Sequence, residues 1–158
     1  MKPSLTTGFS FGLASGVITT LGLMVGLHSG THSQSVVIGG ILTIAIADAM
    51  SDAMGIHISE ESKNSQTERE IWESTVATFL TKFGVALTFV VPVLVLPLTA
   101  AVVASIVWGL ALLAVLSFVL ARMQHLSPWN VIPEHVLIGI AVITITHYVG
   151  GWIGARFG

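Results

Sequence analysis

Five apolar stretches, each long enough to cross a lipid bilayer as a helix, constrain this chain more than any other feature of its sequence. They cover residues 9–27, 35–58, 75–96, 98–121 and 135–157. A membrane helix needs roughly 20 predominantly apolar residues, because the hydrocarbon core is about 30 Å thick. Only 9% of the 158 residues are charged, whereas a soluble domain has about 25%. The sequence therefore predicts an all-α integral membrane protein, a single domain of five transmembrane helices.

The basic residues indicate how these helices are oriented. With five spans, the ends of the chain lie on opposite sides of the membrane. Only Arg156 falls on the C-terminal side, and the other basic residues fall on the N-terminal side: Lys2, Lys63, Arg69, Lys82 and Arg122. Because basic residues favour the cytoplasmic side, we expect a cytoplasmic N-terminus and an outside C-terminus. The polar segment 59–74 is then cytoplasmic.

Glycines recur every four residues in the first and last stretches. The three groups are Gly8, Gly12 and Gly16, then Gly22 and Gly26, and finally Gly150 and Gly154. Small residues at this spacing let two membrane helices approach closely. Two interpretations follow: the glycines pack helices within one protomer, or the first helix forms the seam of a homodimer. We expect a homodimer, because five helices make a thin bundle for a polar path.

Two carboxylates within the second stretch are the main functional signal. Asp48 and Asp52 are four residues apart and therefore share one face of a helix. An ionisable side chain inside a membrane span is costly and marks a functional site by default. Such a pair can bind a hard divalent cation or exchange protons. The structural alternative is that hydroxyl groups of Ser15, Thr19 or Thr20 on a neighbouring helix cap both acids.

A second pattern follows the other side of the same stretch, at steps of four, three and four residues. Its members are Met50, Met54, His57 and Glu61. Thioether, imidazole and carboxylate groups together suit a transition metal such as ferrous iron, although methionines at helical spacing also simply pack. One straight helix cannot direct both faces at the same ion, so the two patterns predict separate sites or different sides of a dimer. Glu60 and Glu61 begin an acidic segment that would gather cations at an entrance, or would only form a solvated turn.

Two other polar residues fall within predicted spans. Lys82 lies one or two helical turns into the third stretch, and we expect its long side chain to reach the cytoplasmic interface. Pairing with an acid is the alternative for Lys82. His147 lies in the fifth stretch, and we expect it to make a hydrogen bond rather than to relay protons.

Composition excludes several functions. The chain has no cysteine, so disulfides and thiolate metal sites are excluded, and its formal net charge of -2 leaves no basic surface for nucleic acid. It contains no nucleotide-binding loop, no Gly-x-Ser-x-Gly motif and no His-Glu-x-x-His motif. We therefore do not expect an enzyme or a prosthetic group.

Motifs in the first two stretches carry a family resemblance. The first contains Phe-Gly, a glycine followed by small residues, a threonine pair and Gly-Leu. The second contains Ala47, Asp48, Ala49, Ser51, Gly55 and Ser59. In these features, and more weakly over nearly the whole chain, the protein resembles the vacuolar iron transporter family. The resemblance implies a five-helix homodimer that moves ferrous iron or manganese out of the cytoplasm in exchange for protons.

The chain departs from the family pattern at four places. Ser15 stands where the family carries an aspartate, Asp52 where it carries a methionine, and Ile56, followed by His57, where it carries a glutamate. The family's long acidic insert is reduced to residues 59–74. The resemblance therefore makes Asp52 a candidate to replace the missing first-helix acid from across the gap between two helices.

Taken together, these observations predict a small dimeric transporter of a divalent cation, iron or manganese, coupled to protons. Asp48 and Asp52 are the expected intramembrane site, with Met50, Met54 and His57 as ligands nearer the cytoplasm. Two other functions are open: a membrane-embedded assembly or interaction protein without transport activity, and a transporter of another small cation.

Overall fold

The computed structural model describes residues 2–63 and 65–158, and these residues form six helices. The helices are α1 (Pro3–Thr31), α2 (Gln34–Ser62), α3 (Glu68–Thr88), α4 (Val90–Val95), α5 (Leu98–Met123) and α6 (Pro128–Phe157). Helices α3 and α4 follow each other almost without a break and together form one span, 68–95. The described chain thus has five helical spans that are long and apolar enough to cross a membrane, as the five stretches predicted.

The helices extend further than the apolar stretches. Most of the polar segment 59–74 belongs to α2 and α3, which leaves only a short loop between them. Helix α3 begins with a capping box, in which the side chain of Thr67 accepts a hydrogen bond from the Glu70 amide and the Glu70 carboxylate accepts one from the Thr67 amide. At the other end of the chain, Pro128 starts α6 and Pro133 lies inside it. Pro128 fits the first turn, because amides there have no helical partner.

Two prolines explain the interruptions of the helix before and after α4. Pro92 and Pro97 lack amide hydrogens, so the carbonyl groups four residues before them lose their helical donors. One of these carbonyls, that of Val93, instead accepts a hydrogen bond of 2.5 Å from the side-chain amide of Gln34 at the start of α2. The chain then turns at Leu96 and Pro97 into α5, as the sequence predicted.

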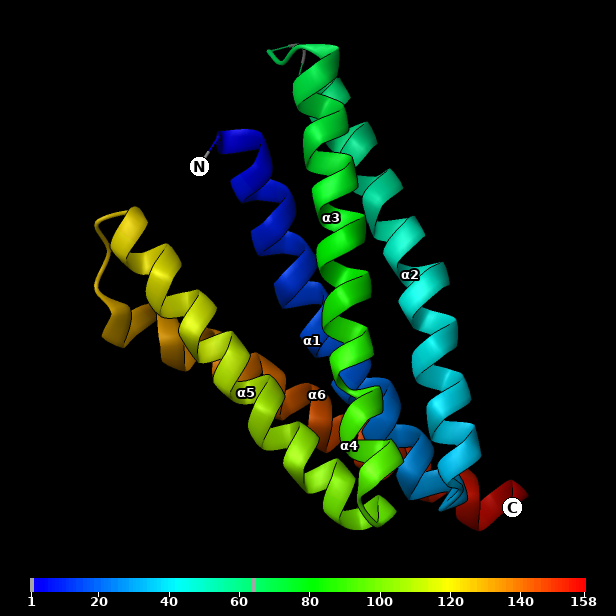
Figure 1. Cartoon of the computed structure of the whole chain (residues 1–158). Coiled ribbons are helices and arrows are strands. Elements are labelled where there is room, and N and C mark those ends of the chain that lie inside the picture. Colours follow the sequence, from blue (N-terminus) through cyan, green and yellow to red (C-terminus); the bar gives the residue numbers. More distant parts are fainter. Residues whose placement is uncertain (1, 64) are drawn as a thin grey trace.

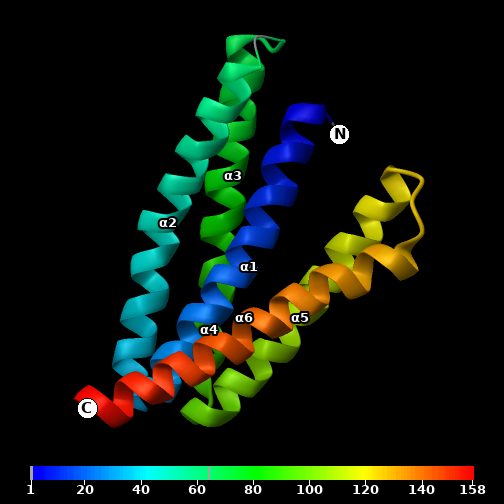
Figure 2. The same ribbon diagram turned by 180° about the vertical axis from the view of Figure 1, so that it is seen from behind.

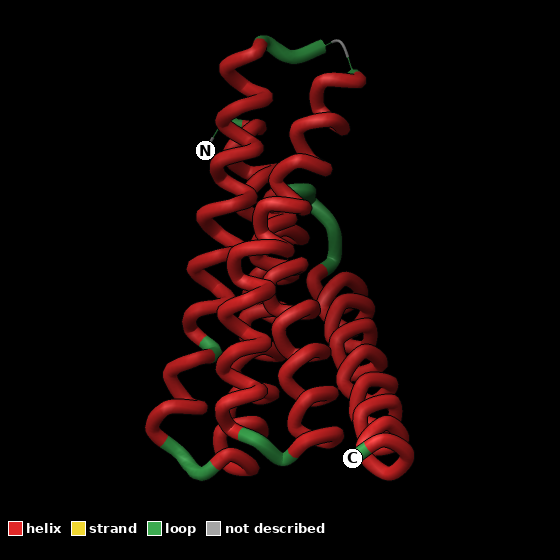
Figure 3. Tube along the Cα trace, turned by 90° about the vertical axis from the view of Figure 1, so that its right-hand side faces the viewer, coloured by secondary structure: helices red, strands yellow, loops and turns green. Residues whose placement is uncertain are grey.

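Helix α1 is the central element of the structure. It packs against α2 and α3 on one side and against α5 and α6 on the other. In Figure 1, α1, α2 and α3 run together, and the hairpin of α5 and α6 crosses the lower half of α1 obliquely; the view from behind in Figure 2 shows the same arrangement. The side view in Figure 3 shows that only short loops join these long helices.

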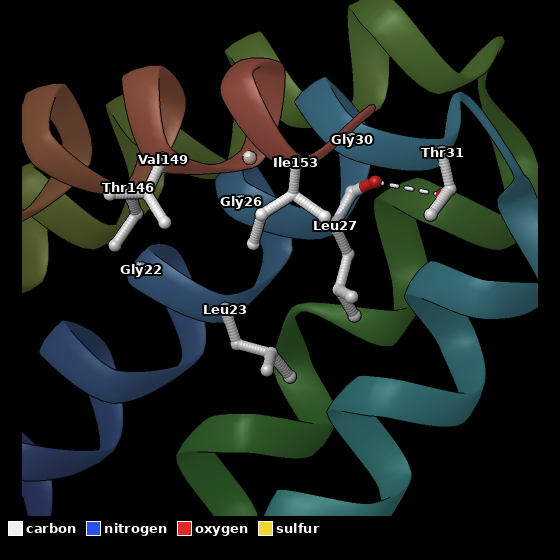
Figure 4. Close-up of a pocket in the computed structure, with 10 residues that line it drawn as sticks. Gly22, Leu23, Gly26, Leu27, Gly30, Thr31, Thr146, Val149 and Ile153 are labelled. Carbon is white, nitrogen blue, oxygen red and sulfur yellow. Dashed lines mark hydrogen bonds between the residues drawn. The ribbon is translucent and has the colours of Figure 1, made fainter. Parts of the chain in front are cut away.

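The glycines of α1 allow this central position. A Cβ atom on Gly12 would lie 2.7 Å from the carbonyl oxygen of Thr78 on α3, which is closer than such atoms can approach. In the second half of α1, Gly26 and Gly30 face Gly150 and Gly154 of α6, where a Cβ on Gly154 would lie 2.5 Å from the Gly30 carbonyl oxygen. Figure 4 shows Thr146, Val149 and Ile153 of α6 beside this half of α1. Both glycine series therefore pack helices of one protomer, the first of the two alternatives, and the homodimer stays a prediction.

The apolar side chains divide between a small core and a large outer surface. Val17, Leu21 and Met24 of α1 form the core with residues such as Ile41 of α2 and Phe89. Many other large apolar side chains point outward. They include Ile46, Leu80, Val107, Leu137 and Trp152, each more than half exposed. An exposed apolar surface on this scale is unfavourable in water and suits a protein that is surrounded by lipid.

Candidate functional site

The two acids of α2 lie on one face of the helix, far from both of its ends. Asp48 lies about 21 Å along the helix axis from the first residue of α2, and Asp52 lies one turn further on. Their side chains are 31% and 21% exposed. The sequence prediction that both carboxylates share one helical face deep in the second span is therefore confirmed.

A buried lysine completes the site. The side chain of Lys82 on α3 is only 2% exposed, and its Nζ atom lies 2.6 Å from Oδ2 of Asp48. The same ammonium donates a hydrogen bond to Oδ2 of Asp52 and another, of 2.9 Å, to Oγ of Ser15 on α1. The expectation that Lys82 extends to the membrane interface is wrong, and the alternative, pairing with an acid, is confirmed. We call Asp48, Asp52 and Lys82 the triad.

Lys82 lies well inside α3. The capping box starts the helix at Glu68, so Lys82 also lies about 21 Å from the first residue of its helix. Its ammonium is held between helices by Asp48, Asp52 and Ser15 rather than directed toward a helix end. Glycine helps on the facing helix, because a Cβ on Gly16 would lie only 3.3 Å from the Cα and Cγ atoms of Lys82.

A hydroxyl group from α1 caps one of the two acids. Oγ of Ser15 donates a hydrogen bond of 2.6 Å to Oδ2 of Asp52. This contact is one of the hydroxyl caps expected under the structural alternative, although it reaches only one of the two acids. Thr20, also considered as a cap, is buried, and its hydroxyl has no hydrogen-bond partner among the described residues.

The triad has more negative than positive charge. With all three groups ionised, two carboxylates face one ammonium, which leaves one net negative charge. Oδ2 of Asp48 has the ammonium of Lys82 as a cationic partner at 2.6 Å, but it makes no hydrogen bond of good geometry among the described residues. The two carboxylates therefore share one cation, and their excess negative charge would attract a divalent ion.

A groove reaches the triad from the side of α1 and α6. Asp48 lines it together with Thr19 and Gly22 of α1 and Thr146 of α6, and its volume is about 480 Å³. An adjoining groove of about 270 Å³ shares Gly22 and Thr146 and continues along α1 (Figure 4). Asp48 is therefore the member of the triad that lines this groove.

The second predicted stripe forms a separate groove. Met50, Met54 and His57 line a volume of about 470 Å³ with Trp72 and Phe79 of α3. Both methionines are more than half exposed. Nδ1 of His57 lies 3.0 Å from the hydroxyl of Thr75, and its ring contacts the edge of Trp72. The structure thus gathers three members of the stripe on the opposite side of α2 from the triad, as two separate sites require.

The glutamates of the polar segment are largely occupied by basic neighbours. Glu60 is buried and bonds to Lys63 at 2.7 Å and to Gln66. Glu73 contacts Lys2 at 2.8 Å and Arg69 at 3.1 Å, whereas Glu61 is exposed. Lys63 therefore neutralises Glu60 and weakens its part in the suggested entrance, whereas Glu61 stays a candidate for that role.

Three other histidines lie on α6 (His147) and at the end of α1 (His28 and His32). Nδ1 of His147 is 2.6 Å from the hydroxyl of Ser29, which confirms the expected hydrogen bond in the fifth span. The rings of His28 and His32 lie 5.4 Å apart near the end of α1. Within residues 2–63 and 65–158, no three histidine, aspartate or glutamate side chains come together in a way that would hold a metal ion.

Sequence reasoning missed Lys82 as a member of the site, although a signal was present. Two acids and a single base all lie in the interior of helical spans, and unlike charges in membrane interiors pair with one another. Comparison with known proteins adds nothing to the assignment: no family model, no curated protein and no solved structure matches the chain.

Proposed function

We propose that this chain is a multi-pass membrane protein that carries a divalent transition-metal ion, iron or manganese, out of the cytoplasm in exchange for protons. The five apolar spans support insertion into a membrane. The basic residues outside the triad support a cytoplasmic N-terminus, although Lys82 no longer counts toward that orientation because it is buried in a span.

The triad is the observation on which the proposal depends. Its two carboxylates lie deep in the span, they outnumber its one ammonium group, and Asp48 lines an open groove. Carboxylate oxygens bind manganese and other hard divalent ions, and ferrous iron accepts the same ligands. A site for a positively charged substrate accounts for all three features.

The proposed cycle uses the two carboxylates alternately for metal and protons. From the cytoplasmic side, a divalent ion binds Asp48 and Asp52. Protons that arrive from the outside then neutralise the carboxylates, which lowers their attraction for the metal and releases it. The resemblance to vacuolar iron transporters supports this direction of transport, and the contact between Ser15 and Asp52 supports Asp52 as the replacement for the family's first-helix acid. As that resemblance implies, we propose that the chain acts as a homodimer.

Metal flux into proteoliposomes tests the proposal. Ferrous iron, manganese, cobalt, zinc and calcium would be offered at two pH gradients to the parent and to Asp48→Asn and Asp52→Asn. Glu134→Gln, which removes an exposed acid on α6, is the matched control. We expect gradient-dependent flux in the parent and the control and its loss in both aspartate variants. Full flux in folded Asp52→Asn would contradict the assigned site.

A second function, a membrane-embedded assembly protein, has one observation in its favour. Lys82 already contacts both aspartates and Ser15, so the polar groups join α1, α2 and α3 even without a substrate. In that case, the triad serves only to hold helices together. Metal ions would then leave the thermal unfolding temperature of the folded protein unchanged, whereas a transporter that binds them is stabilised by mass action.

A further inference from the structure

The ammonium group of Lys82 occupies the position that a transported cation would take. It contacts three oxygen atoms, one from Asp48, one from Asp52 and one from Ser15. These atoms come from α1 and α2, the two helices that pack most extensively around α3. Among the described residues, the charged groups of α1 and α2 that contact the ammonium are Asp48 and Asp52. If a metal ion were bound by both carboxylates, it and the ammonium would therefore repel each other at short range.

We propose that Lys82 is a tethered cation that competes with the substrate for Asp48 and Asp52 and so makes the site selective for divalent over monovalent ions. This inference rests on the proposed function and names what determines its selectivity. Lys82 has a flexible four-carbon stem, so its ammonium can leave the carboxylates without a change in the backbone. Ser15 offers a neutral acceptor 2.9 Å away, where the ammonium retains a partner.

Charge explains the selectivity. A monovalent ion gains no more Coulomb energy from the two carboxylates than the ammonium that it must replace. The ammonium also has the advantage of its covalent attachment, because a tethered group acts at an effective concentration of mM or more. A divalent ion interacts with the same carboxylates twice as strongly at equal distance. The tethered ammonium is therefore displaced by divalent ions and retained against sodium or potassium.

The alternative role for Lys82 is to neutralise the acids as a permanent structural partner. The two roles predict opposite effects of removing the ammonium. A competitor, once removed, leaves a site that binds metal more tightly and no longer discriminates against monovalent ions. A permanent structural partner, once removed, leaves a site that is less well ordered and that binds metal no more tightly than before.

Binding of Mn²⁺ to the purified, full-length protein separates these roles, with free Mn²⁺ measured by electron paramagnetic resonance at one neutral pH. The variants are Lys82→Met and, as a control that removes an exposed basic residue from α5, Arg122→Met. We expect Lys82→Met to bind Mn²⁺ about tenfold or more tightly and to lose it on addition of sodium, with the control unchanged. Equal or weaker Mn²⁺ binding by folded Lys82→Met would overturn the proposal.

A second pair of variants covers the case in which Lys82→Met does not fold. Asp52→Asn retains Asp48 and Lys82, and the double variant Asp52→Asn/Lys82→Met has the same net charge at the triad as the parent. Competition predicts that the double variant binds Mn²⁺ more tightly than Asp52→Asn does, and equal binding overturns it. If no folded variant binds Mn²⁺, the proposed transport function fails as well. If the parent binds and removal of Lys82 changes nothing, only the competition fails.

Discussion

The ammonium of Lys82 and the carboxylate of Asp48 lie 2.6 Å apart, although the two residues belong to different helices and each lies deep within its span. This relationship links the fold to the proposed function. It holds α2 against α3 through unlike charges, and because Asp52 contacts the same ammonium, the site has one carboxylate more than it has ammonium groups.

Removal of the lysine should destabilise the metal-free protein. Lys82→Met leaves two carboxylates that face each other without a cation, and breaking a buried ion pair in this way costs about 3 kcal/mol. Asp52→Asn/Lys82→Met should recover part of that loss, because only one acid then lacks a partner. Thermal unfolding in detergent, followed by tryptophan fluorescence, measures both. A Lys82→Met protein as stable as the parent would show that the ion pair does not hold the helices together.

Substitution by alanine should change the free energy of unfolding very differently at two neighbouring glycines of α6. A Cβ on Gly150 would meet the backbone of Gly26 on α1, whereas a Cβ on Gly151 would find nothing within 4 Å. We expect Gly150→Ala to lower the free energy of unfolding by about 1–3 kcal/mol, since the two helices must separate. Gly151→Ala should be neutral or slightly stabilising, because alanine favours the helix. Equal effects of the two substitutions on the unfolding temperature would contradict the close crossing of α1 and α6.

The side chain of Gln34 should stabilise the junction of α3, α4 and α5. Its amide group donates to the carbonyl of Val93, whose helical partner would be the missing amide hydrogen of Pro97. Gln34→Leu leaves that carbonyl without a donor, and we expect a loss of about 1–3 kcal/mol of stability. Faster amide hydrogen exchange confined to residues 90–97 would locate the effect, and unchanged exchange there would contradict it.

Much of the fold could be predicted from the sequence, because it depends on local composition. The five spans follow from apolar length, and the shared face of Asp48 and Asp52 follows from helical periodicity. Where α3 begins could not be predicted from hydropathy, because a capping box at Thr67 extends the helix into polar residues. The partners of Lys82 could not be predicted either, because they depend on how α3 packs against α1 and α2.

Tertiary packing accounts for the rest of what the sequence left open. Glycine spacing shows that helices approach closely but does not say which helices, and the structure pairs the two halves of α1 with α3 and α6. Similarly, the spacing of Met50, Met54 and His57 predicts a shared stripe, whereas their groove with Trp72 depends on how α2 packs against α3. Contacts between distant segments are set by the assembled bundle.

Exchange of the residues at positions 15 and 52 should preserve the site. The Ser15 hydroxyl lies 2.6 Å from the Asp52 carboxylate, and the Lys82 ammonium contacts both. In the double variant Ser15→Asp/Asp52→Ser, an acid on α1 replaces the acid on α2, and the total charge of the triad region is unchanged. We expect Asp52→Ser alone to lose metal flux and the double variant to regain a substantial part of it.

The double variant should also regain thermal stability relative to Asp52→Ser, because the carboxylate on α1 can again pair with the ammonium of Lys82. Ser15→Asp alone is the matched control. It adds a third acid beside one ammonium, so we expect it to be less stable than the parent. A double variant no more active or stable than Asp52→Ser would show that the carboxylate must lie on α2, and Asp52 would then not be equivalent to a first-helix acid.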